Sequence, residues 1–196
     1  MRHWFVAWLF CTLLAGTTGA AQAADAKGDA AAAEDRIQKI HAHFSAGCFN
    51  RCWGLIDKTN RSAEDVEDML LLAHASLWHW KQRSDCKPLN LSIGYWQVSR
   101  VYALAGEYEM ARLFGTKCLK VGQDNRLPPF YLGYAYEALA RAELLDKTED
   151  QAKELLAKAR EELKRVADKE EEQLLGADLD SLEKLVTNKA GDGGKK

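Results

Sequence analysis

Residues 95–119 read YWQVSRVYALAGEYEMARLFGTKCL and contain two helical patterns separated by a glycine. On both sides of Gly106, apolar side chains recur every three or four residues, which is the spacing of one face of an α-helix. Glycine readily takes the backbone conformation that ends a helix, so Gly106 marks the turn between the two patterns. The stretch therefore predicts a hairpin of two short helices.

A second stretch, residues 136–160, is similar to the first after a shift of 41 residues and reads YEALARAELLDKTEDQAKELLAKAR. Arg100 then aligns with Arg141. Small residues also recur at three aligned pairs of positions, which are Ser99 with Ala140, Ala111 with Ala152, and Cys118 with Ala159. Small side chains allow the two helices of a hairpin to approach closely. The pattern therefore indicates a weak internal repeat.

The first copy resembles the tetratricopeptide repeat, in which small residues on two helices pack together and a tyrosine follows one turn later. The matching positions are Ser99, Tyr102, Gly106, Ala111 and Cys118. The second copy keeps Ala140, Ala152 and Ala159, but Glu143 replaces the aromatic residue and Lys147 replaces the glycine. The usual repeat is near 34 residues, so the longer shift implies a longer connection over residues 121–128.

Further stretches resemble a group of small bacterial proteins that are described only as tetratricopeptide-like. These stretches are FSAGCFNRCWGLIDK (residues 44–58), HASLWHW (74–80), NLSIGYWQ (90–97) and LPPFYLGYAYEALARA (127–142). The resemblance covers about residues 37–182. It implies a fold, without an assigned activity.

Helical periodicity continues through the rest of the chain, and strand-like alternation does not stand out. A first helix is expected over residues 34–57, with one apolar stripe made of Ile37, Ile40, Phe44, Cys48, Cys52 and Ile56. A seventh helix is expected over residues 170–186. The predicted fold is all-α: a short tetratricopeptide-like solenoid of about three helical hairpins plus a C-terminal capping helix.

Several helix starts are predicted from local signals. Ser62 and Asp65 form a capping-box pattern for the second helix, and Thr148 with Gln151 forms another for the sixth. Asn90 is expected to cap the third helix. Pro128 and Pro129 suit the first turn of a fifth helix, where a missing N–H costs nothing.

Both ends of the chain are predicted to lie outside the helical domain of residues 34–186. A basic start, an apolar run over residues 4–15 and the sequence Ala21-Gln22-Ala23 indicate a secretory signal peptide over residues 1–23. The run is too short to span a bilayer, so we expect a periplasmic or secreted protein without a membrane anchor after cleavage. Residues 24–33 predict a flexible leader and residues 187–196 a disordered tail.

Charge and cysteine content limit the partners and leave the redox state open. The net charge is −2 and no basic block stands out, so no nucleic-acid partner is expected. Four cysteines follow the predicted cleavage point: Cys48, Cys52, Cys86 and Cys118. Four cysteines allow three pairings. They are buried thiols or include a long-range disulfide, for which Cys52 and Cys86 are the candidates.

The stretch HASLWHW, residues 74–80, raises the question of a catalytic cluster. On a helix His74 and His79 lie about 140° apart, so they cannot share one metal ion. Ala73, Leu77 and Trp80 form the predicted buried face instead. The chain has no nucleophile-elbow, zinc-protease or phosphate-loop motif, so neither an enzyme activity nor a cofactor is predicted.

One alternative is a periplasmic protein that binds a small ligand or a metal. His41, Cys48 and Cys52 are its candidate ligands, because imidazole and thiolate groups suit zinc or copper.

The favoured function is a non-catalytic exported adaptor that binds a protein or peptide in the concave groove implied by the tetratricopeptide resemblance. The groove residues would be Trp96, Arg100, Tyr134, Glu137 and Arg141. The guanidinium groups could grip a carboxylate or a carbonyl, and the aromatic rings supply contact area. The alternative interpretation is that these residues pair with one another and complete the packing between hairpins.

Overall fold

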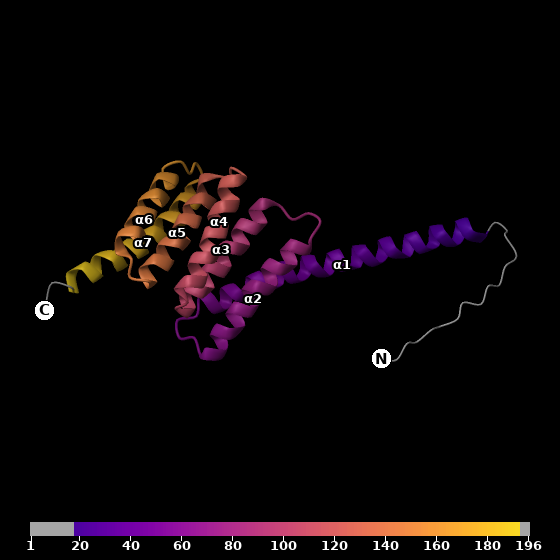
Figure 1. Ribbon diagram of the computed structural model, residues 1–196, viewed down its shortest axis with the longest axis horizontal. Coiled ribbons are helices and arrows are strands. Elements are labelled where there is room, and N and C mark those ends of the chain that lie inside the picture. The colour runs from indigo at the N-terminus through magenta and orange to yellow at the C-terminus, as the bar shows by residue number, and fades with distance from the viewer. Residues whose placement is uncertain (1–17, 193–196) are drawn as a thin grey trace, which may run out of the picture. The chain divides into compact units, whose positions relative to one another are not determined.

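The computed structural model of the chain describes residues 18–192, with side chains over residues 27–186. Within this range the chain forms only helices and turns, which confirms the all-α prediction (Figure 1). The seven helices are α1 (Thr18–Ile56), α2 (Ala63–Gln82), α3 (Pro88–Ala105), α4 (Tyr108–Asp124), α5 (Pro129–Leu145), α6 (Glu149–Leu163) and α7 (Lys169–Asp192).

The chain divides into two units, Met1–Ile37 and Gln38–Lys196, and every feature of the candidate site lies in the second. α1 begins at Thr18 and includes residues 24–33, so the stretch expected to be a flexible leader is helical in the structure. Alanine is the best helix former, and this segment is rich in it. α7 likewise continues to Asp192, into the predicted disordered tail. Residues 1–17 of the predicted signal peptide lie outside the described range.

Three of the predicted helix boundaries are confirmed. The Ser62 hydroxyl accepts the Asp65 N–H at 3.1 Å, and the Asp65 carboxylate accepts the Ser62 N–H at 2.7 Å. Pro129 is the first residue of α5. Gly106 ends α3 with a φ of 83°, a left-handed conformation that costs glycine little.

The cap predicted at Asn90 is wrong, and Thr148 is the N-cap residue of α6 without the predicted side-chain capping bond. α3 begins at Pro88 rather than after Asn90, and Asn90 accepts the Lys87 N–H at 2.9 Å from within the first turn. Thr148 precedes α6, but its hydroxyl donates to the Glu143 carbonyl oxygen at 3.1 Å instead of capping α6. Asn90 thus satisfies the N-cap amide of α3 from the third helical position, whereas Thr148 binds back to the end of α5.

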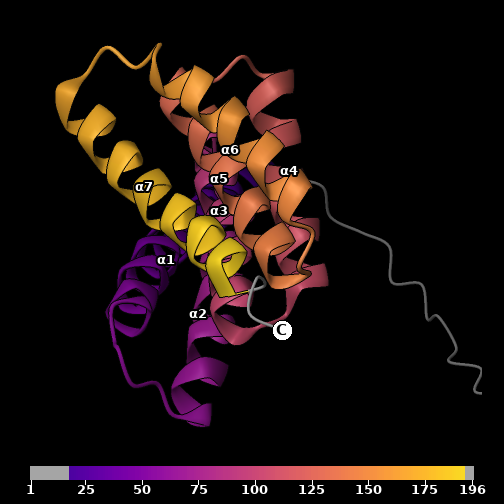
Figure 2. The ribbon, with the colours of Figure 1, turned by 90° about the vertical axis from the view of Figure 1, so that its left-hand side faces the viewer.

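Neighbouring helices pack in a regular order in the second unit. From α2 to α7 each helix contacts the next, and α3 with α5 and α5 with α7 are also in contact. Figure 2 shows α7 alongside α5 and α6. This order places the odd-numbered helices α3, α5 and α7 next to one another.

Small residues stand where the helices of each hairpin meet. The Ser99 hydroxyl on α3 donates to the Ala111 carbonyl oxygen on α4 at 2.7 Å, which requires a close approach. The small residues of both sequence copies are buried: Ser99, Ala111, Cys118, Ala140, Ala152 and Ala159. Leucines from α6 and α7 complete one core cluster, and side chains from α1 to α4 form another.

Candidate functional site

An aromatic groove lies on the second unit, and α1, α3, α4, α5 and α7 contribute residues to its lining. It encloses about 480 Å³ and is lined by six aromatic residues. These are Phe49, Trp53, Trp96, Phe130, Tyr131 and Tyr134. The other lining residues are Ser92, Ile93, Cys118, Leu174 and Asp178. The volume falls within the range of typical ligand sites, about 300–1,000 Å³.

The aromatic rings form a continuous row across three helices. The rings of Trp53 on α1 and Trp96 on α3 stack with centroids 5.6 Å apart. Trp96 meets Tyr134 of α5 edge to face at 5.3 Å, and Tyr134 meets Phe130 in the same manner at 5.0 Å. Such contacts hold the rings in fixed orientations. The row is therefore built before any ligand arrives.

A buried carboxylate lies beside this row. Glu137 on α5 has no exposed surface, and it accepts a hydrogen bond from Trp96 Nε1 at 3.1 Å. Arg141 Nε, one turn further along α5, also donates to it. Arg100 Nη1 from α3 lies 3.5 Å from Glu137 Oε1. A buried charge is tolerated only with such partners.

The two predicted groove arginines do not line the aromatic groove. Arg100 and Arg141 instead line a separate cavity of about 180 Å³ together with leucines that include Leu104, Leu144 and Leu182. Burial, followed by the charge of Arg141, lowers the pKa of the Arg100 guanidinium. Its Nε and Nη1 atoms have no hydrogen-bond partner within the described residues.

The five predicted groove residues lie close to one another, but only two of them line the aromatic groove. Trp96 and Tyr134 line the groove, whereas Glu137 is fully buried and joins Arg100 and Arg141 in intramolecular pairs. The arginines therefore have an internal carboxylate to bind. This pairing is the intramolecular arrangement that the sequence allowed as the alternative, and the binding of a ligand carboxylate or carbonyl group by the two arginines stays a prediction.

Asp178 of α7 is a groove residue that the sequence did not identify. Its Oδ2 accepts the Tyr134 hydroxyl at 3.0 Å, and its Oδ1 lies 3.5 Å from Arg141 Nη2. Burial, followed by the charge of Asp178, raises the pKa of the Tyr134 phenol. A signal was present, because Asp178 falls four residues after Leu174 and so on the same face of the helix.

The stretch HASLWHW is divided between separate environments. Ala73 and Leu77 are buried, as predicted, but Trp80 of the same predicted face is only half-buried. Trp78 is 54% exposed. His74 Nε2 lies 3.0 Å from the Tyr102 hydroxyl. His79 Nδ1 lies 2.8 Å from His41 Nδ1 of α1.

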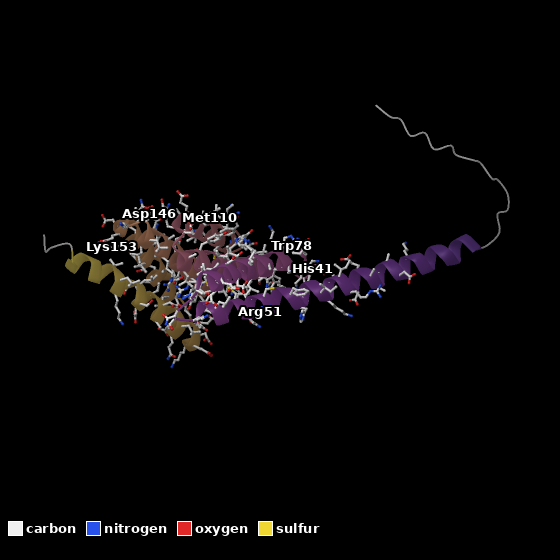
Figure 3. All side chains as sticks on the ribbon, turned by 90° about the horizontal axis from the view of Figure 1, so that it is seen from below. His41, Arg51, Trp78, Met110, Asp146 and Lys153 are labelled. Carbon is white, nitrogen blue, oxygen red and sulfur yellow. The ribbon has the colours of Figure 1, made fainter. Side chains whose placement is uncertain are left out.

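Figure 3 shows the labelled His41 and Trp78 beside each other, and their ring centroids are 5.4 Å apart. Ser76, between the two histidines in sequence, is buried and donates to the Ser45 carbonyl oxygen at 2.7 Å. Its hydroxyl therefore joins α2 to α1.

The cysteines do not form the alternative sites that the sequence allowed. All four described cysteines are free thiols, so Cys52 and Cys86 are not joined. Cys52 donates to the Met69 carbonyl oxygen at 3.5 Å, and burial raises its pKa to about 12. Among the described residues no group of three or more His, Cys, Asp or Glu is arranged to hold a metal ion. The proposed ligands His41, Cys48 and Cys52 are thus not assembled.

We compared the chain with known protein families, curated proteins and solved structures. No family model, curated protein or solved structure matches the chain. Over the part of the chain that the structure describes, no helix combines the length and the apolar character needed to cross a bilayer.

Proposed function

We propose that this protein is a non-catalytic, tetratricopeptide-like module that binds an extended protein or peptide segment in its aromatic groove. The observation that carries the proposal is the row of rings from Trp53 through Trp96 and Tyr134 to Phe130. Rigid aromatic side chains offer a large contact area at a low cost in conformational entropy, and such residues dominate binding energy at interfaces.

The packing order of the helices supports a tetratricopeptide-like arrangement. In such an array the first helices of successive hairpins lie side by side and line one face. Here α3 contacts α5 and α5 contacts α7, and each also contributes to the groove. The buried small residues of both sequence copies, Ala111 and Ala152 among them, fit the same arrangement.

The chemistry of the groove favours binding over catalysis. Cys118 is the only thiol in the described lining, and burial raises its pKa to about 12, so it is not a thiolate near neutral pH. Its sulfur donates to the Ser92 carbonyl oxygen at 3.3 Å. The Ser92 hydroxyl in turn faces that sulfur at 3.5 Å and has no histidine or lysine beside it in the groove lining.

The N-terminal pattern of the sequence supports export, so the proposed site of action is the periplasm or the exterior of the cell. Cleavage after Ala23 would separate the helical domain from the signal peptide. N-terminal sequencing of the protein recovered from the periplasm tests this part of the proposal. A mature chain that still carries residues 1–23 would contradict it.

Panning of a random peptide library against the purified protein tests the binding function. We expect an enriched set of sequences that binds the wild type and is lost from Trp53→Ala. Trp78→Ala is the matched control, because Trp78 is exposed and lies outside the groove. Tyr131→Ala is a second groove variant in case Trp53→Ala unfolds. Folded groove variants that retain the same peptides at the same affinity would contradict the proposal.

A further inference from the structure

The positive and negative side chains near the aromatic groove line different cavities. The guanidinium groups of Arg100 and Arg141 line the small leucine-walled cavity and share the buried carboxylate of Glu137. None of the residues that line the aromatic groove is a lysine or an arginine. The only carboxylate in that lining is Asp178. The ligand-facing side of the network therefore carries negative charge and no positive charge.

Asp178 is accessible enough to meet a ligand. Its side chain is 37% exposed, in contrast to Glu137, which has no exposed surface. Its hydrogen bond from Tyr134 fixes one carboxylate oxygen at the edge of the aromatic row. The Arg141 contact at 3.5 Å is long for a hydrogen bond, and Arg141 also donates to Glu137. Asp178 thus keeps capacity to accept a further hydrogen bond.

A second acidic residue acts electrostatically on the groove lining. Glu171, on the first turns of α7, acts on Tyr131 of the groove lining, where its charge adds to the effect of burial and raises the phenol pKa. Both acids come from α7, whose first turn is acidic: Glu170, Glu171 and Glu172. Glu171 therefore carries the same sign of charge as Asp178, the carboxylate of the groove lining.

The aromatic faces also suit a cation. Trp, Tyr and Phe rings attract lysine and arginine side chains through the negative potential at the ring face, and tryptophan does so most strongly. Trp53, Trp96 and Tyr134 lie in one row that ends next to the Asp178 carboxylate. A row of rings beside one carboxylate combines apolar contact with an anionic anchor.

We propose that the groove binds a peptide segment in which a lysine or arginine is flanked by apolar residues. The cationic group would lie against the rings of the aromatic row and reach the Asp178 carboxylate, while the flanking apolar side chains cover the remaining rings. This inference rests on the proposed peptide-binding function and specifies the sign of the charge that the partner carries.

Fluorescence anisotropy with two labelled peptides tests the inference. Each peptide has a leucine on either side of a central residue, which is lysine in one and norleucine in the other. Norleucine keeps the apolar stem of lysine and lacks the ammonium group. We expect the lysine peptide to bind the wild-type protein about tenfold more tightly, and the difference to shrink as salt is added.

Two variants of α7 provide the matched comparison. Asp178→Asn can still accept the Tyr134 hydrogen bond, and we expect it to reduce the preference for lysine to less than about threefold. Asp180 is on the same helix, but its carboxylate pairs with Arg160 outside the groove. We therefore expect Asp180→Asn to keep the tenfold preference for lysine.

The outcomes separate this inference from the function on which it rests. Equal binding of both peptides, or a lysine preference that survives Asp178→Asn, overturns the cationic ligand and leaves peptide binding in place. Failure of both peptides, together with a random library that yields no groove-dependent sequence, overturns the peptide-binding function itself.

Discussion

Glu137 is the residue whose replacement tests the buried charge network most directly. Its carboxylate is fully buried and is held by Trp96 Nε1 and Arg141 Nε, with Arg100 Nη1 at 3.5 Å. The change Glu137→Gln keeps the size of the side chain and removes its charge. Both guanidinium groups would then lose their shared buried counter-ion, so the variant should be less stable than the wild type.

The size of the loss follows from how little water can reach the two arginines. Removal of one partner from a buried ion pair costs about 3–5 kcal/mol, because the remaining charge stays desolvated. The side chains of Arg100 and Arg141 retain 19% and 15% exposure, and Arg141 keeps Asp178 at 3.5 Å. These features place the expected loss at the lower end of that range, at about 3 kcal/mol.

Glu143→Gln is the matched control on the same helix. Glu143 is also nearly buried and pairs with Arg112, but the Arg112 side chain is 35% exposed and contacts Asp146 as well. Water and Asp146 can compensate Arg112, so we expect a loss of only about 1 kcal/mol. Addition of Arg100→Met to Glu137→Gln should recover part of the larger loss, because it removes the guanidinium group that has lost its buried counter-ion.

Urea unfolding followed by far-UV circular dichroism measures these free energies, provided that the dependence on urea concentration is the same in all variants. The reasoning predicts a clearly lower midpoint for Glu137→Gln than for Glu143→Gln. Equal losses of unfolding free energy in the two variants would refute it, because the Glu137 network would then be no more sensitive to the loss of its carboxylate than the more exposed Glu143 pair. A double variant less stable than Glu137→Gln would refute the assigned role of Arg100.

Two further changes test the packing and the histidine pair. Gly133→Ala should lower the free energy of unfolding by about 1–3 kcal/mol, because the new methyl group would overlap Leu175 of the core. Gly47→Ala meets open space and should raise the free energy of unfolding by up to about 1 kcal/mol, because alanine is the better helix former. Urea unfolding measures both changes, and equal effects would contradict the assigned packing. Burial, followed by the charge of His41, lowers the pKa of His79. The unfolded chain therefore binds a proton at His79 more readily than the folded chain does. The free energy of unfolding should fall as the pH drops below about 6.5. His79→Gln should weaken this dependence, and thermal unfolding at several pH values would show an unchanged slope if the reasoning is wrong.

The sequence predicts the hairpins better than it predicts which faces are covered. Small residues at Ser99 and Ala111 correctly indicate a close approach of α3 and α4, because only small side chains permit the hydrogen bond between them. The apolar stripe of α1 is correct for Cys52 and Ile56, which are buried, but Phe44 on the same stripe is 45% exposed. Periodicity shows which residues share a face, and it does not show whether another helix reaches that face.

The candidate site is predictable where its contacts are local. Glu137 and Arg141 are four residues apart on one helix, the spacing at which opposite charges meet, so their pairing could be read from the sequence. Asp178 contacts Tyr134 across 44 residues of chain. That contact depends on the way α7 packs against α5, which the helical pattern of neither segment specifies.

The carboxylate that α7 contributes to the groove reverses the charge that we propose for the ligand. From the sequence, two aligned arginines predict a groove that binds an anionic or carbonyl group, but Glu137 neutralises them from within and they line a different cavity. The groove itself retains only the carboxylate of Asp178. Charge reversal of Arg100 and Arg141 would therefore place new carboxylates around a buried one and unfold the protein, which reveals nothing about the ligand. Neutralisation of Asp178 changes the charge of the groove lining and leaves Glu137 with both arginines, so Asp178 is the residue at which the proposed sign of the ligand charge is tested.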